Sequence, residues 1–176
     1  MDSLPFGEMA LRIGAAVGLA ALVGLERERK HRPAGFRTMI LISLGSAGFM
    51  MLGEEAIRSF GGATGQAEIS RILQGLMGGV GFLGAGAVIQ NKKAVRGLTT
   101  AAAVWVTSAV GAACGMGMYK LAALVTFAQL FTLVILEYFE ETYFPDHFAN
   151  EDETNGKARV ERVVLDGEGQ PLEPKE

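Results

Sequence analysis

The sequence predicts an all-helical, multi-pass membrane protein, built as a bundle of about five transmembrane helices. Apolar residues make up 49% of its 176 residues and charged residues only 20%, and the charges lie between long apolar runs. A bilayer core about 30 Å thick requires about 20 mostly apolar residues for each helix that crosses it. A helix of a soluble protein carries a polar stripe at helical spacing, which these runs lack, so a very apolar soluble bundle is the disfavoured alternative.

The predicted helices follow the charge-free runs in chain order. They cover Phe6–Leu25, Thr38–Ile57, Ile69–Gln90, Leu98–Met116 and Tyr119–Tyr138. Together they form a predicted transmembrane domain over residues 6–138, in which the turn at residues 115–120 is the least distinct boundary. The first run has no basic segment before it and no small-residue cleavage site after it, so we expect an uncleaved helix rather than a signal peptide.

Lysine and arginine are distributed unevenly among the loops. They gather in the first loop (residues 26–38), in the third loop (91–97) and in the tail, and they are sparse on the opposite side. Because these residues favour the cytoplasmic side, we expect the N-terminus outside and the C-terminus in the cytoplasm. The aromatic residues of 139–149 are expected at the membrane interface. The acidic residues 150–176 are expected to form a mobile cytoplasmic tail with no folded C-terminal regulatory domain.

The 24 glycines fit helix packing in a membrane, where small residues let two backbones approach closely. On the third helix, glycines fall on one side and aliphatic residues on the other. We therefore expect the glycine side to be buried at the centre of the bundle and the aliphatic side to meet lipid. Small residues also share one face of the first helix and one face of the fourth. The predicted packing glycines are Gly14, Gly18, Gly75, Gly78, Gly79, Gly81, Gly86, Gly111 and Gly115.

Charged side chains mark both ends of the first helix. An ionised group inside a bilayer costs about 2.5–3.5 kcal/mol on insertion scales. Glu8 and Arg12 are four residues apart and are expected to pair. Glu26 lies five turns further along the same face, about 27 Å away, so this face carries an acid at each membrane surface. The alternative is an interfacial ion pair with no further role.

Polar residues also open the third helix. They are Glu68, Ser70, Arg71 and Gln74. In one interpretation, Ser70 caps nearby amides and Glu68 lies favourably at the positive helix start. In the other, the four residues form a polar cluster at the outer mouth of the bundle, with Arg71 and Gln74 turned inward beside the glycines.

Two further groups of acids remain open to interpretation. Glu54 and Glu55, together with Glu8 and Glu68, could attract a hard divalent cation such as Mg²⁺, although nothing in their spacing fixes a site. The acids of the first loop suggest ion pairs with basic residues such as Arg37 or Arg96. The alternative for that loop is a solvated contact with anionic lipids.

Several function classes find no support. One Cys and two His leave no disulfide framework and no Cys- or His-based metal centre. The charge balance gives no reason to expect nucleic acid. No Ser/His/Asp grouping and no paired carboxylates at hydrolase spacing occur, so we expect no enzyme. Residues 79–84 match the dinucleotide pattern G-x-G-x-x-G, but they lie inside an apolar run without the acidic residue about 20 positions on.

Five segments taken in order suggest a family. They are Gly24–Glu28, Pro33–Thr38, Ser70–Ile72, Gly79–Gly86 and Val95–Ala102. With these segments the chain resembles the MgtC/SapB family of membrane proteins over about residues 8–136. The likeness is specific because GFLGAG and VRGLTTAA occur together at the family's separation.

This resemblance implies a bacterial inner-membrane protein linked to magnesium homeostasis and to growth at low Mg²⁺. It also implies a non-enzymatic regulator, since studied members of the family act on the proton-translocating ATP synthase. Virulence-type members carry a folded cytoplasmic domain after the last helix, which we do not expect here. The motif positions carried over are Glu8, Arg12, Glu26, Arg27, Arg37, Ser70, Arg71, Gln74, Arg96, Thr99 and Thr100, with Glu68 where many relatives have Asp.

The leading hypothesis is therefore a regulator that acts through contacts within the bilayer. Its expected partners are the lipid bilayer and either a membrane protein, such as the ATP synthase or another transporter, or a second copy of the chain. The alternative is a transporter or channel for Mg²⁺ or another ion, which would require an oligomer. A structural membrane component without any link to ions is the third hypothesis. No cofactor is assigned, and Mg²⁺ is the candidate ligand.

Overall fold

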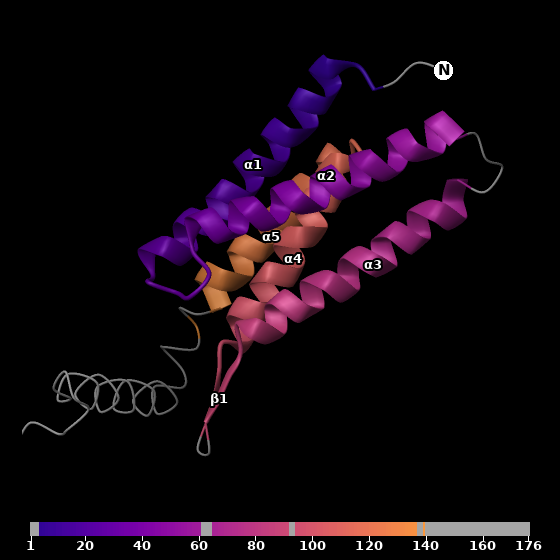
Figure 1. Cartoon of the computed structure of the whole chain (residues 1–176). Helices are drawn as coiled ribbons and strands as arrows, with labels where there is room; N and C mark the ends of the chain where they lie inside the picture. Colours follow the sequence, from indigo (N-terminus) through magenta and orange to yellow (C-terminus); the bar gives the residue numbers. More distant parts are fainter. Residues whose placement is uncertain (1–3, 61–64, 92–93, 137–138, 140–176) are drawn as a thin grey trace, which may run out of the picture. The chain divides into compact units, whose positions relative to one another are not determined.

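The computed structural model describes residues 4–60, 65–91, 94–136 and 139, and these residues confirm the all-helical prediction. Within these ranges, five α-helices follow one another (Figure 1). They are α1 (Phe6–Arg29), α2 (Phe36–Phe60), α3 (Gly65–Gly86), α4 (Leu98–Gly115) and α5 (Tyr119–Phe131). Each begins within four residues of its predicted start, because the helix starts coincide with the charged and turn-forming residues that interrupt the apolar runs.

Four segments of the described residues are long and apolar enough to cross a membrane. They are Phe6–Arg29, Phe36–Arg58, Leu98–Gly115 and Tyr119–Leu136. The third predicted span, α3, forms a helix of 22 residues but is not among the four. Polar residues in its first half and glycines in its second half lower its mean hydropathy. The described chain thus has the helices of a multi-pass membrane protein, and its orientation in the bilayer stays a prediction.

Three helices form the centre of the bundle. The helices α1, α2 and α4 pack against one another, α5 packs against α1 and α4, and α3 lies against α2 and α4. The buried core consists largely of small side chains, with Ala16 of α1, Ala47 of α2, Cys114 of α4 and Ala122 of α5 fully covered. Small side chains let helix backbones approach closely, which is how helices associate in lipid without a hydrophobic driving force.

The closest approach in this bundle joins α2 and α4. A Cβ atom added at Gly111 would lie 2.7 Å from the Cα of Ser43, and one added at Gly115 would lie 2.6 Å from the carbonyl oxygen of Ala47. Any side chain at either glycine would therefore overlap the backbone of α2. The predicted small face of α4 is confirmed, because the small and polar residues that recur there at helical spacing are buried. These residues are Thr100, Val104, Thr107, Ser108, Gly111, Cys114 and Gly115.

The predicted role of the glycines on α1 and α3 is wrong within the single chain. No described atom lies within 4 Å of a Cβ added at these positions, which are Gly14, Gly18, Gly75, Gly78, Gly79, Gly81 and Gly86. In α1 the buried face instead carries Ala16, Ala20 and Val23. In α3 it is the aliphatic side, through Val80, that is buried. On both helices, side chains that end in methyl groups make the contacts with the neighbouring helices. The glycine sides of α1 and α3 remain uncovered by the described chain.

A short hairpin between α3 and α4 was not predicted. Strand β1 (Ile89–Asn91) pairs with strand β2 (Ala94–Arg96) in an antiparallel register. The third helix consequently ends at Gly86 rather than at the predicted Gln90. Gly97 then turns the chain into α4 with φ +88°, and a Cβ there would lie 3.4 Å from the Cα of Val88 as well as against the backbone of Ala87. Glycine populates this left-handed region without steric cost.

A second compact unit begins at residue 132. Its described part is a single π-helical turn, Thr132–Leu136, together with Phe139. The remainder of the predicted interfacial segment 139–149 and the predicted tail 150–176 lie outside the described residues, as do the last two residues of the fifth predicted helix.

Candidate functional site

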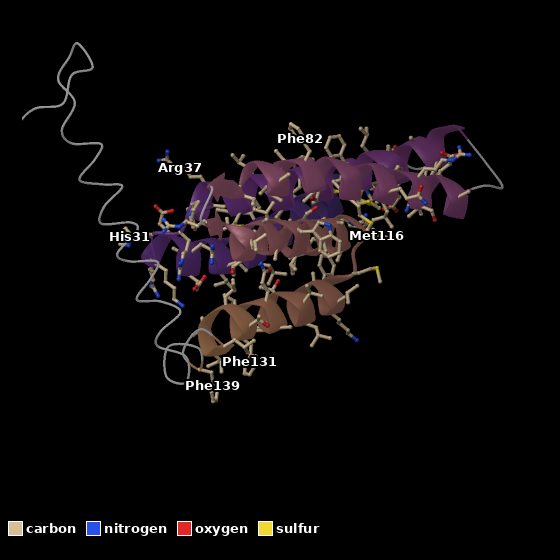
Figure 2. All side chains as sticks on the ribbon, turned by 90° about the horizontal axis from the view of Figure 1, so that it is seen from below. His31, Arg37, Phe82, Met116, Phe131 and Phe139 are labelled. Atoms are coloured by element: carbon tan, nitrogen blue, oxygen red, sulfur yellow. The ribbon has the colours of Figure 1, made fainter. Side chains whose placement is uncertain are left out.

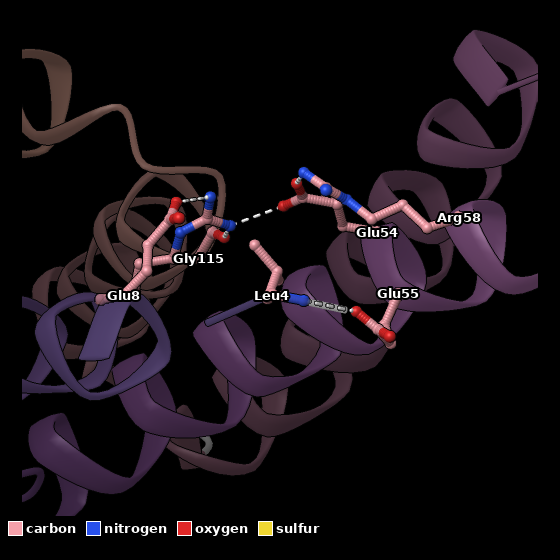
Figure 3. A network of polar contacts seen from close by, with 7 residues as sticks. Leu4, Glu8, Glu54, Glu55, Arg58 and Gly115 are labelled. Carbon is pink, nitrogen blue, oxygen red and sulfur yellow. Dashed lines mark hydrogen bonds and ion pairs between the residues drawn. The ribbon is translucent and has the colours of Figure 1, made fainter. Parts of the chain in front are cut away.

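A buried arginine joins three helices at one end of the bundle (Figure 3). Arg12 of α1 donates hydrogen bonds to Glu8 of the same helix, to Glu54 of α2 at 2.5 Å, and to the backbone carbonyl of Gly115 in α4 at 2.7 Å. Its side chain is only 6% exposed. A carbonyl at a helix C-terminus carries partial negative charge, so all three partners stabilise the guanidinium. We name these residues the Arg12 cluster.

The Arg12 cluster bears on two predictions, the pairing of Glu8 with Arg12 and the binding of a divalent cation by nearby acids. Glu8 and Arg12 pair as expected. Glu54 forms a second ion pair with Arg58 at 2.7 Å, and Glu55 accepts a hydrogen bond from the backbone amide of Leu4 at 3.2 Å. The acids considered for a divalent cation are therefore engaged by arginines and by a backbone amide.

A second buried arginine lies at the opposite end of α1. Arg27 is 2% exposed, and its Nη2 donates a hydrogen bond of 2.6 Å to the hydroxyl of Thr100 in the first turn of α4. This contact joins two segments that are 73 residues apart in the sequence. Both residues are among the predicted motif positions, and nothing in their spacing indicated that they touch. We name this pair the Arg27 contact.

Two acids of the first loop contact groups that are close to them in the chain. Glu26 lies 3.0 Å from the ammonium group of Lys30, and Glu28 accepts a hydrogen bond of 3.0 Å from the backbone amide of Phe36, the first residue of α2. An acid at a helix N-terminus satisfies an otherwise unpaired amide and complements the helix dipole. Arg37 forms no ion pair within the described residues, and its side chain projects away from the bundle at the end where His31 lies (Figure 2).

Neutral polar side chains connect the helices between the two arginines. The hydroxyl of Ser43 donates to the carbonyl of Ala16 at 3.0 Å, and the hydroxyls of Ser46 and Ser108 lie 2.8 Å apart. On α5, Gln129 donates to Thr107 at 3.1 Å and to a backbone carbonyl of α4. No sequence pattern predicted a role for Ser43, Ser46 or Gln129. A signal was present for Gln129, because an amide within an apolar run is costly in lipid unless it is paired.

The polar start of α3 does not form the inward cluster. The side chain of Arg71 is 74% exposed, and its guanidinium lies 2.9 Å from the carboxylate of Glu68. Ser70 and Gln74 are also exposed. The inward interpretation is therefore wrong for the described chain, since the packed side of α3 is the aliphatic one. The remaining motif positions, Thr99 and Arg96, lie at the start of α4 and in β2, and Thr99 is exposed.

The carboxylates of the described residues do not gather into a cluster of metal ligands. Mg²⁺ requires near-octahedral oxygen ligands and is usually bound through one or two carboxylates and several waters. No group of three or more His, Cys, Asp or Glu side chains with metal-binding proximity occurs in the described ranges. The carboxylates of Glu8 and Glu54 are both hydrogen-bonded to Arg12.

The chain is similar to several bacterial proteins. It is 41% identical over 141 residues to Protein SrpB of Synechococcus elongatus, and the alignment covers 74% of this chain and 77% of SrpB. It is 36% identical over 138 residues to the "Putative magnesium transporter YhiD" of Escherichia coli K12, covering 78% of this chain and 63% of YhiD. It is 36% identical over 126 residues to Protein MgtC of Salmonella typhimurium, covering 72% of this chain and 51% of MgtC.

The matched part thus spans about half of MgtC and less than two thirds of YhiD. No solved structure matches the chain. The family model of the MgtC family matches residues 13–142, a range that includes the Arg27 contact and four of the five helices in full. With this match and the identity to SrpB, the sequence resemblance is confirmed: the chain belongs to the MgtC family.

Proposed function

We propose that this chain is a non-enzymatic protein of the bacterial inner membrane that takes part in magnesium homeostasis and growth at low Mg²⁺. It acts as a regulator, by contacts that its helices make with another membrane protein. Membership of the MgtC family and the name of its relative YhiD support the link to magnesium. The family resemblance makes an ATP synthase the first candidate partner.

The observation that carries the choice of a regulator is the pair of buried arginines. Arg12 and Arg27 lie at opposite ends of the seam where α1, α2 and α4 meet. Between them, the backbones of α2 and α4 are in contact at Gly111, and hydroxyl groups of α2 bond to the backbone of α1 and to Ser108 of α4. A cation that followed this seam would meet a guanidinium at each end, and arginines in a pore act as barriers to cations.

Reconstituted protein tests this proposal. The full chain is placed in liposomes that contain a magnesium-sensitive dye, beside liposomes that are empty and liposomes that hold a known magnesium channel. We expect Mg²⁺ entry equal to that of the empty liposomes. In parallel, the tagged chain is purified from bacterial membranes in mild detergent, and we expect ATP synthase subunits to be enriched over a tagged, unrelated membrane protein of similar size.

Growth at low Mg²⁺ tests the role of the Arg27 contact in cells. In a strain that lacks its own MgtC-family protein, we expect the wild-type chain to restore growth and Arg27→Gln to fail. Arg29→Gln is the matched control, because Arg29 lies two residues away and is exposed. Membrane levels of all variants are compared by immunoblot. Equal growth of the two variants at equal levels would contradict the proposal.

A transporter is the second candidate, favoured by the name of YhiD. Because the seam within one copy is closed, an ion pathway would have to form between copies. Mg²⁺ entry well above that of empty liposomes would establish this alternative. It would also refute the regulator, provided that Arg27→Gln, folded and inserted to the same extent, abolishes the entry.

A further inference from the structure

An apolar groove runs between α2 and α3, open to the surroundings of the helices. Its volume is about 830 Å³, within the range of about 300–1,000 Å³ that is typical of small-molecule sites. Its walls are almost entirely apolar, with Leu41 and Phe49 on α2 and Leu76 and Leu83 on α3. The hydroxyl of Ser46, which lines it, is already hydrogen-bonded to Ser108. The groove therefore offers dispersion contacts and little for a polar ligand to bind.

The length of the groove distinguishes its possible occupants. Its lining residues on α2 run from Thr38 to Phe49, and those within α3 run from Ile72 to Leu83. At 1.5 Å per residue, each wall is about 16 Å long. This length equals one leaflet of the hydrocarbon core, about 15 Å, which is the depth that one lipid acyl chain occupies. The groove thus matches one acyl chain.

Charge at one end of the groove indicates the headgroup. Arg37 directly precedes Thr38, is exposed, and forms no ion pair within the described part of the chain (Figure 2). Because Arg37 lies in the first turn of α2, next to Thr38 of the groove, its guanidinium lies at the depth of lipid headgroups when α2 crosses the membrane. A guanidinium binds phosphate oxygens through two parallel hydrogen bonds.

From these observations we infer that the groove between α2 and α3 holds an acyl chain of an anionic phospholipid, whose phosphate is bound by Arg37. The lipid completes the contact between α3 and α2 on a side where glycines leave room. Gly45, Gly75 and Gly79 line the groove, and no described atom lies within 4 Å of a Cβ added to any of them. This site is independent of the magnesium-related function proposed above.

Two pairs of variants of the full chain test the site. Gly45→Leu places a side chain in the groove, while Gly48→Leu places the same side chain on α2 at a glycine that does not line the groove, where an added Cβ likewise meets no described atom within 4 Å. Arg37→Gln removes the charge, and Arg29→Gln is its control. Each variant is expressed in bacteria, purified in mild detergent with equal amounts of phosphatidylglycerol and phosphatidylethanolamine, and weighed intact by native mass spectrometry.

We expect the wild type and both controls to retain one phosphatidylglycerol per chain. Gly45→Leu should lose lipid of both kinds, and Arg37→Gln should lose about fivefold in its preference for phosphatidylglycerol, the effect of one basic residue near an anionic surface. Equal retention by Gly45→Leu and Gly48→Leu would overturn the inference, and so would a wild type without bound lipid. A wild-type dimer that only Gly45→Leu dissociates would also overturn it, and would assign the groove to a second copy.

Discussion

The contact between α4 and α2 predicts that Gly111→Ala destabilises the bundle while Gly78→Ala does not. A Cβ at Gly111 would lie 2.7 Å from the Cα of Ser43, whereas one at Gly78 meets no described atom within 4 Å. Two carbon atoms pack best at about 3.5–4.0 Å, so the helices would have to separate locally by about 1 Å. A flexible side chain could move aside, but Ser43 presents its backbone, so the whole of α2 must shift.

The expected free-energy cost of this overpacking is about 1–3 kcal/mol. Alanine also favours the helix over glycine by about 0.8–1.0 kcal/mol, an effect that both variants share and that cancels in the comparison. The difference between the variants is therefore also about 1–3 kcal/mol. On the scale of a chain of about 150–250 residues, 1 kcal/mol shifts the Tm by about 2–4 °C. Gly111→Ala should thus melt roughly 2–12 °C below Gly78→Ala.

Fluorescence of Trp105, the single tryptophan of the chain, provides the assay in detergent. Wild type and both variants are heated under identical conditions, and heating rates are varied because membrane proteins often unfold irreversibly. Equal melting temperatures for the two variants would refute the close packing of α2 and α4. A lower melting temperature for Gly78→Ala alone would show that the glycine side of α3 is packed, contrary to the structure of the single chain.

Three further predictions concern polar contacts. Thr100→Val keeps the shape of the side chain but leaves the buried Arg27 without its hydroxyl partner, so we expect a loss of about 1.5–3 kcal/mol by the same thermal assay; a neutral effect would show that the hydrogen bond is not formed. Arg12→Gln should lower the free energy of unfolding by about 2–3 kcal/mol, which is less than the 3–5 kcal/mol of a fully buried pair because the acids that Arg12 binds are partly exposed. Arg71→Gln, at an exposed pair, should lower it by at most about 1 kcal/mol. Equal losses for the two variants would contradict the burial of Arg12. Glu28→Ala should cost about 0.5–1 kcal/mol and speed amide hydrogen exchange at the start of α2, through the loss of its bond to a backbone amide; unchanged exchange there would exclude this role.

The helices themselves could be predicted because the bilayer imposes a length and an apolar composition on each of them. The small face of α4 was also predictable, since polar and small residues recur there at helical spacing in an otherwise apolar run. Pairing of Glu8 with Arg12 followed from their separation of four residues. These features are local, and a local pattern is sufficient to predict them.

The contacts between distant segments could not be predicted in this way. The partners of Arg12 on α2 and α4, and the contact of Arg27 with Thr100, depend on how the helices are rotated about their axes. Rotation also explains the wrong prediction for α3. Glycines were expected to mark its buried side, but a glycine face marks a contact only when a neighbour lies against it, and within one chain the neighbours of α3 lie on its aliphatic side.

The two buried arginines give a physical reason for several of the motif positions. A guanidinium within a bundle is stabilised when its Nη donors find acceptors, and here acceptors come from other helices. Arg12 joins α1 to α2 and α4, and Arg27 joins α1 to α4. Because they lie at opposite ends of α1, the two contacts together fix both the tilt and the register of α1 against α4. A partner that acts on this chain by displacing α1 would have to break one of them, so the strength of these contacts limits how strongly α1 can respond.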